Sequence, residues 1–165
     1  MTFKGNEPEW IKKQITEISV EYINFDGVIK TGIILCNQYI AESLIEIFQK
    51  LLEIKFPIHK ISPISEFNWD DDLSCISNNS SCYNYRNILG TDKLSDHLVG
   101  MAFDINPMQN PWITNKYGNL PKGSLYNIED IGTITNEVVN IFKKYGFLWG
   151  GKWENPDYQH FYIIK

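Results

Sequence analysis

Two of the three histidines in this chain lie close in sequence to a carboxylate. His97 comes seven residues before Asp104, and His160 comes three residues after Asp157. Two imidazoles and one carboxylate suit zinc in a tetrahedral site whose fourth position is left to water. Such a site can polarise a carbonyl and acidify the water, so metal-assisted hydrolysis is one chemistry open to this chain. A packed or surface histidine explains each position equally well on spacing alone.

The segment between His97 and Asp104 must bend if both side chains are to reach one ion. Residues seven apart on a regular strand point to opposite faces. Gly100 lies between them and can supply the bend, and small Ala102 leaves room beside a metal. We therefore expect these two side chains to converge around a turn at Gly100.

The segment around Asp157 and His160 predicts a second contribution to the same site. The two residues can lie together if residues 157–160 form one helical turn, which Pro156 is well placed to start. His160 would then bind the metal. Asp157 would stay off the metal and accept the proton of the water.

Hydrophobic periodicity predicts the elements that position these side chains. Alternation over 16–24 and 28–36, with Asp26-Gly27 between, predicts a hairpin, and apolar three- and four-residue steps predict helices over 40–55 and 128–145. Further strands are expected at 99–105 and 161–164, with long polar loops at 68–96 and 106–127. Paired strands with helices between them favour an α+β fold: one small domain over 1–165, with a mainly antiparallel sheet, flanking helices and residues 1–25 the least defined part.

Composition excludes several functional classes. A chain with 43% hydrophobic residues and a net charge of −5 predicts a folded protein that does not bind nucleic acid. The sequence has no apolar run long enough to span a membrane and no recognisable signal peptide, and we expect a monomer. Cys36, Cys75 and Cys82 form no CxxC pair and are interpreted as buried thiols, with a Cys75–Cys82 disulfide left open.

Two motifs resemble the M15 peptidases, the zinc D-Ala-D-Ala carboxypeptidases, dipeptidases and phage L-alanyl-D-glutamate endopeptidases. The family pattern S-x-H-x-x-G-x-A-x-D is complete, at Ser95, His97, Gly100, Ala102 and Asp104. The second pattern, an acid three residues before a histidine that an aromatic follows, is present at Asp157, His160 and Phe161. Flanking segments at 71–74, 78–81, 83–86 and 149–153 are also similar, so the resemblance covers roughly 26–165.

The resemblance implies a fold and a role for each site residue. The fold would be like those of Hedgehog and the D,D-peptidases, with one Zn²⁺ held by His97, Asp104 and His160. Asp157 would be the base, and Ser95 would line the substrate site. Arg86 would stabilise the scissile carbonyl or its oxyanion; a structural ion pair is the alternative role for Arg86.

The same resemblance implies peptidoglycan stem peptides as the substrate. It favours a D-Ala-D-Ala carboxypeptidase, with an L-Ala-D-Glu endopeptidase of the phage endolysin type as the alternative. Action on the cell wall, in the periplasm or outside the cell, is expected, and release from the cytoplasm by a phage-type route would also fit. Two other classes stay open: a non-catalytic wall-binding module on the same fold, and a metal-free glycosidase that would use the Asp and Trp residues.

Overall fold

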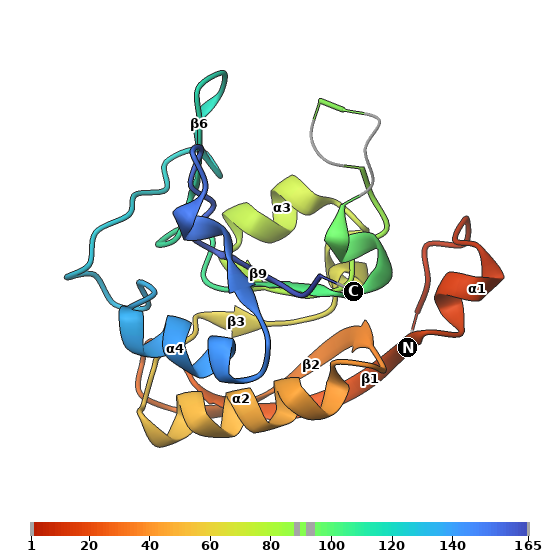
Figure 1. Cartoon of the computed structure of the whole chain (residues 1–165), viewed down its shortest axis with the longest axis horizontal. Helices are drawn as coiled ribbons and strands as arrows, with labels where there is room; N and C mark the ends of the chain where they lie inside the picture. The colour runs from red at the N-terminus through yellow and green to blue at the C-terminus, as the bar shows by residue number, and fades with distance from the viewer. Residues whose placement is uncertain (1, 88–89, 92–94, 165) are drawn as a thin grey trace.

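The computed structural model describes residues 2–87, 90–91 and 95–164 (Figure 1). The helices are α1 (Glu9–Lys12), α2 (Ala41–Glu53), α3 (Asp71–Ile76) and α4 (Asn136–Lys144), with 3₁₀ helices η1 (Ile64–Phe67), η2 (Asp96–Val99) and η3 (Gly150–Lys152). The strands are β1 (Ile15–Ile23), β2 (Ile29–Asn37), β3 (Lys60–Ile61), β4 (Asn79–Ser80), β5 (Ala102–Asp104), β6 (Trp112–Thr114), β7 (Gly118–Leu120), β8 (Leu148–Trp149) and β9 (His160–Tyr162). Strand pairs are antiparallel except β3–β4. The predicted α+β class is confirmed.

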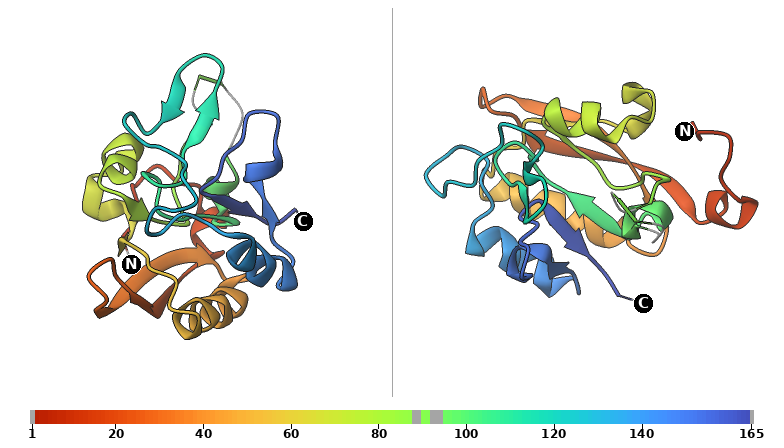
Figure 2. Two further views of the ribbon diagram at one scale, coloured as in Figure 1. Left: turned by 90° about the vertical axis from the view of Figure 1, so that its left-hand side faces the viewer. Right: turned by 90° about the horizontal axis from the view of Figure 1, so that it is seen from above.

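The predicted hairpin and first long helix form one side of the molecule. β1 pairs with β2 from Ile15↔Asn37 to Ile23↔Ile29, and α2 lies along the hairpin (Figures 1 and 2). The helix buries one apolar stripe, made of Leu44, Ile47, Phe48 and Leu51. The three- and four-residue spacing of that stripe explains why the segment is an amphipathic helix and why it packs on the sheet.

A second layer packs against this core through phenylalanines of the small sheet β5–β9–β8. Phe103 of β5 meets Phe48 edge to face, with ring centroids 5.2 Å apart, and Phe161 of β9 stacks on Phe142 of α4 at 3.9 Å. All four rings are almost completely buried. These aromatic contacts fix β5 and β9 to both long helices.

The second predicted helix, 128–145, is wrong in its first half, because α4 begins only at Asn136. Thr135 caps it, since its side chain accepts a hydrogen bond from Val138 N. Gly132 adopts φ +79°, and Ile128 and Ile131 are 54% and 50% exposed. Apolar spacing continued upstream of the cap, but Ile128 and Ile131 face solvent, and the buried Ile134 precedes the helix.

The other predicted boundaries also need correction. The strand expected over 99–105 shortens to β5, because η2 ends at Val99 and Gly100 turns the chain at φ +67°. The polar loop 68–96 contains α3, which Asp70 caps by accepting from Leu73 N at 2.9 Å. The loop 106–127 contains the β6–β7 hairpin, and the strand expected at 161–164 is β9.

The cysteines and the helix lengths bear on two other expectations. All three cysteines are free, so the disulfide that the sequence left open does not form. Burial raises the pKa of Cys36 to about 12, which keeps its thiol protonated. Among the described residues, no helix combines the length and apolar character needed to cross a membrane.

Candidate active site

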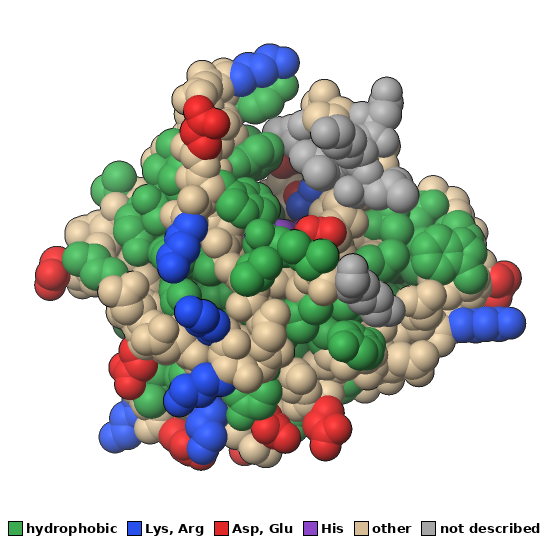
Figure 3. All heavy atoms as spheres, viewed as in Figure 1, with side chains coloured by type: hydrophobic (Ala, Val, Ile, Leu, Met, Phe, Trp, Pro, Cys, Tyr) green, Lys and Arg blue, Asp and Glu red, His purple; other side chains and the backbone are tan. Residues whose placement is uncertain are grey.

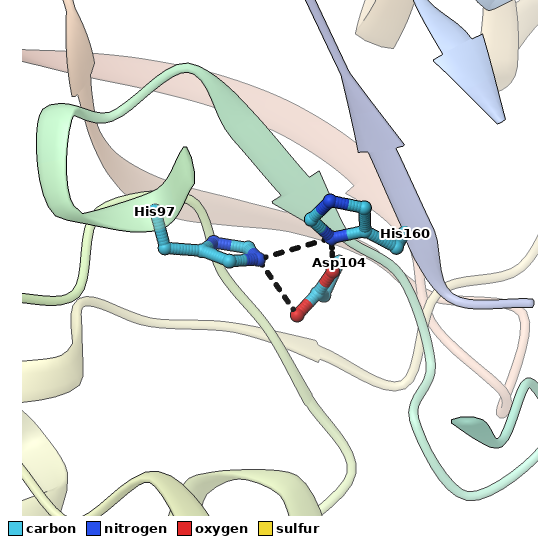
Figure 4. A group of neighbouring side chains, drawn as sticks. All are labelled: His97, Asp104 and His160. Carbon is cyan, nitrogen blue, oxygen red and sulfur yellow. Dashed lines mark hydrogen bonds and ion pairs between the residues drawn. The ribbon is translucent and has the colours of Figure 1, made fainter. Parts of the chain in front are cut away.

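Three side chains from separate elements converge in the structure (Figure 4). His97 comes from η2, Asp104 from the end of β5 and His160 from the start of β9. His97 Nε2 lies 3.1 Å from Asp104 Oδ2, His160 Nδ1 lies 2.9 Å from Asp104 Oδ1, and the two ring nitrogens are 3.2 Å apart. One donor atom from each residue lies within 4.8 Å of the other two. The predicted convergence is confirmed.

Strand pairing brings two of these residues together. In the β5–β9 register Asp104 is opposite His160, and the neighbouring pair is Phe103 with Phe161. Successive side chains on a strand point to opposite faces. Because the phenylalanines point into the core, Asp104 and His160 must point to the other face, where the candidate site lies.

His97 is held through the cap of η2 and through its ring. Ser95 caps η2 by accepting from His97 N at 3.3 Å. The ring nitrogen Nδ1 faces the Cys82 carbonyl. A carbonyl only accepts, so Nδ1 carries the hydrogen and neutral His97 presents the lone pair of Nε2 to the cluster.

Gly100 supplies the bend that the sequence analysis expects, and its surroundings admit no side chain. A Cβ at this position would lie 2.6 Å from Asn37 N and 3.0 Å from the Cys36 carbonyl carbon, both backbone atoms. The bend therefore lets η2 approach β2 closely and turns His97 toward Asp104.

Gly100→Ala should lower the free energy of unfolding by about 3 kcal/mol, because left-handed strain adds to overpacking against backbone. Gly27→Ala is the matched control, since Gly27 has φ +76° with open space around its Cβ position. Urea unfolding of both variants tests this. Equal losses in the two variants would contradict the role given to the contact with β2.

The cluster is buried and its charges are coupled. His97, Asp104 and His160 are 3%, 8% and 7% exposed. Burial alone would raise the pKa of Asp104, but His97 and His160 outweigh it and hold that pKa well below its ordinary range. Burial also tends to lower the pKa of His97, and Asp104 reverses this effect. Two imidazole nitrogens and one carboxylate oxygen form a donor set that fits zinc.

Asp157 lies beside the cluster in a hydrogen-bonded turn rather than the predicted helical turn. His160 N donates to Asp157 O at 3.3 Å, and Asp157 N donates to Gly150 O at 3.0 Å. Burial raises the pKa of Asp157 to about 7; His160 opposes the rise, Asp104 adds to it, and Arg86 and the Gln159 amide oppose it. The buried Oδ1 has no hydrogen-bond partner among the described residues. Asp157 is thus a carboxylate whose pKa is suited to proton transfer near neutral pH.

Arg86 borders the same cleft and is held from one side. Its Nε lies 3.0 Å from Asp71 Oδ1, an oxygen that also accepts from Asn84 Nδ2 at 2.8 Å. Burial opposes the charged form, but Asp71 and Asp104 outweigh it and raise the pKa of Arg86. Arg86 therefore forms the ion pair that was considered as its alternative role. The ion pair uses only part of the guanidinium, and other N–H groups do not contact Asp71.

A cleft of about 620 Å³ joins these groups. Figure 3 shows a histidine at the bottom of a hollow, next to basic and acidic atoms. All six site residues predicted from the sequence line the cleft: Arg86, Ser95, His97, Asp104, Asp157 and His160. The cleft is also lined by Asp71, Trp112 and Gln159, which were not predicted as site residues. Gln159 could have been noticed, because it lies between Asp157 and His160 in the second motif.

The comparisons with known proteins agree with the motifs. Residues 89–163 match a family model described as D-alanyl-D-alanine carboxypeptidase. No curated protein and no solved structure matches the chain, so the expected likeness to Hedgehog-type domains stays a prediction. The matched segment contains five of the predicted site residues, with Arg86 outside it. The match confirms the resemblance of this chain to the M15 peptidases over residues 89–163.

Proposed function

We propose that this protein is a zinc-dependent peptidase that hydrolyses peptide bonds in peptidoglycan stem peptides, most consistently as a D-Ala-D-Ala carboxypeptidase. The observation that carries the proposal is the convergence of His97, Asp104 and His160 beside a partnerless Asp157 oxygen in one cleft. The family match over residues 89–163 supports the carboxypeptidase assignment.

His97, Asp104 and His160 are the residues that would hold the metal. A bound zinc ion would supply Lewis acidity toward the scissile carbonyl and a water of lowered pKa. Asp104 is held ionised, which is the state that a ligand needs. Because Nδ1 of His97 faces the Cys82 carbonyl, deprotonated His97 would present Nε2 to the metal. The buried Phe103 and Phe161 keep both strands in place behind the ligands.

Asp157 would transfer the protons of the reaction. Its carboxylate accepts a proton from the attacking water and returns it to the leaving amine. The partnerless Oδ1 is free to receive that proton, because no hydrogen bond within the described chain occupies it. The backbone contact with Gly150 holds the carboxylate in the cleft, and a Cβ at Gly150 would lie 2.9 Å from Asp157 O.

Arg86 would stabilise the negative charge that develops on the scissile carbonyl oxygen. A preorganised cation in a cleft with little water stabilises such charge more strongly than one in bulk solvent. Asp71 restricts the guanidinium from the α3 side, so the cation does not have to be ordered during the reaction.

Mass spectrometry of purified muropeptides after digestion, with and without chelator, tests the proposal and its alternatives. A carboxypeptidase removes one terminal alanine from pentapeptide stems, and this loss should disappear with chelator. Release of stem peptides that keep D-Glu but lack L-Ala would instead identify the endopeptidase. Glycan cleavage that persists in chelator would support a metal-free glycosidase. Binding without any cleavage by zinc-loaded protein would identify a wall-binding module and contradict the proposal.

A further inference from the structure

Gln159 is a buried polar residue of the cleft whose amide opposes the rise in the pKa of Asp157, but whose carbonyl oxygen the mechanism above does not use. It is 5% exposed and lines the cleft together with Asp104, Asp157 and His160. Its Oε1 is shielded from solvent and has no hydrogen-bond partner among the described residues. Buried polar side-chain atoms are nearly always paired, so an orphaned acceptor needs a cause. We infer that a rotation of the Gln159 carboxamide brings Oε1 to a backbone N–H of the bound peptide, from which it accepts a hydrogen bond, an inference that rests on the proposed function.

The backbone of Gln159 is fixed on both sides, which keeps the side chain in the cleft. Gln159 O accepts from Ile105 N at 3.1 Å, directly after the β5–β9 ladder. The preceding residue, Tyr158, donates its N–H to Pro111 O at 3.1 Å and stacks on Tyr126 with ring centroids 3.7 Å apart. The orphaned acceptor therefore lies on a rigid segment between the proposed base and a proposed metal ligand.

The chemistry of a peptide matches this acceptor. Each peptide unit carries one acceptor and one donor. In the proposed mechanism the scissile carbonyl oxygen faces the side of the cleft where Arg86 lies and where His97, Asp104 and His160 would hold the metal. A neighbouring N–H then needs an acceptor that does not compete for the proton of the water. A neutral carboxamide oxygen meets that requirement, whereas Asp157 is occupied with proton transfer.

Gln159→Met tests the inference, because methionine has a similar length but no hydrogen-bonding amide. The variant should bind the same amount of zinc per chain as the wild type and lose roughly tenfold or more in kcat/KM on a stem peptide. Gln49→Met on the exposed face of α2 is the matched control and should behave as the wild type. Gln159→Glu keeps an acceptor and checks that the position tolerates substitution, through its far-UV spectrum and unfolding midpoint.

Ester analogues separate hydrogen bonding from a structural role. Each analogue replaces one N–H of the peptide with oxygen. At one linkage the ratio of kcat/KM for the amide to that for the ester should be about tenfold lower in Gln159→Met than in the wild type. At the other linkages the ratio should not change. Equal ratios at every linkage, or wild-type kcat/KM in Gln159→Met, would overturn the inference while leaving the proposed function intact. A zinc-loaded wild type that cleaves none of these peptides would overturn both.

Discussion

His160→Ala should remove the metal from the protein and lower kcat/KM by roughly 10³-fold or more. The bound ion would supply several kcal/mol of transition-state stabilisation, and the variant would lose it. His160 is one of the three converging donors, and its ring lies 2.9 Å from Asp104. Without it, His97 and Asp104 alone remain, which is too few for a stable zinc site. Metal content per chain and kcat/KM on a stem peptide measure the two effects.

His59→Ala is the matched control for that experiment. His59 is exposed and lies edge to face against Phe25, with ring centroids 5.3 Å apart, and it does not line the cleft. This variant should keep its metal and its activity. If His160→Ala retained stoichiometric metal and full activity, the assignment of His160 as a ligand would be wrong.

Asp157→Asn should lower kcat by roughly 10²- to 10⁴-fold with little change in metal content, because an amide of the same shape cannot accept the proton. In the wild type the rate should fall toward acid pH, since protonation of Asp157 removes the base. Burial raises the pKa of this carboxyl to about 7 before any metal is considered, and a bound cation would shift the acid limb to lower pH. The variant should lose this acid limb.

The control for the base is Asp26→Asn, in the exposed turn between β1 and β2. Both variants replace a carboxylic acid with an amide of the same shape, so Asp26→Asn shows the effect of this substitution away from the cleft. Metal analysis, kcat and KM should be measured across pH for both. A variant at position 157 that lost its metal in proportion to its activity would identify a ligand or structural residue instead of a base.

Local sequence signals predicted the parts of the fold that carry their own pattern. The alternation of β1 and β2 and the apolar stripe of α2 extend over enough residues to be recognised. The Gly100 bend was also predicted, because a strand with metal ligands seven residues apart must turn. Asp70 caps α3 within the segment that was expected to be a polar loop.

Other elements depend on tertiary contacts that no local pattern encodes. Strands were expected at 99–105 and 161–164, but β5 and β9 have only three residues each, and their pairing joins segments far apart in the chain. The start of α4 depends on the Thr135 cap, because apolar spacing upstream of it suggested more helix than forms. The β6–β7 hairpin was not predicted, because its strands pair over only three residues each.

The candidate site was predictable in its membership but not in its geometry. Spacing alone made His97, Asp104 and His160 one plausible donor set, and the roles of Asp157, Arg86 and Ser95 came from the resemblance to the M15 peptidases. The distances among the three donors and the orphaned Oε1 of Gln159 depend on burial and strand register. The contact of Asp71 with Arg86 joins two segments that only the folded chain brings together.

The most direct test of the metal-dependent mechanism is hydrolysis of a stem peptide by one protein sample before chelation, after chelation and after return of zinc. We predict one zinc per chain at the start, loss of hydrolysis when the metal is removed, and recovery when one equivalent is restored. Far-UV circular dichroism should show that the chain stays folded throughout. Undiminished hydrolysis by folded, metal-free protein would contradict the account.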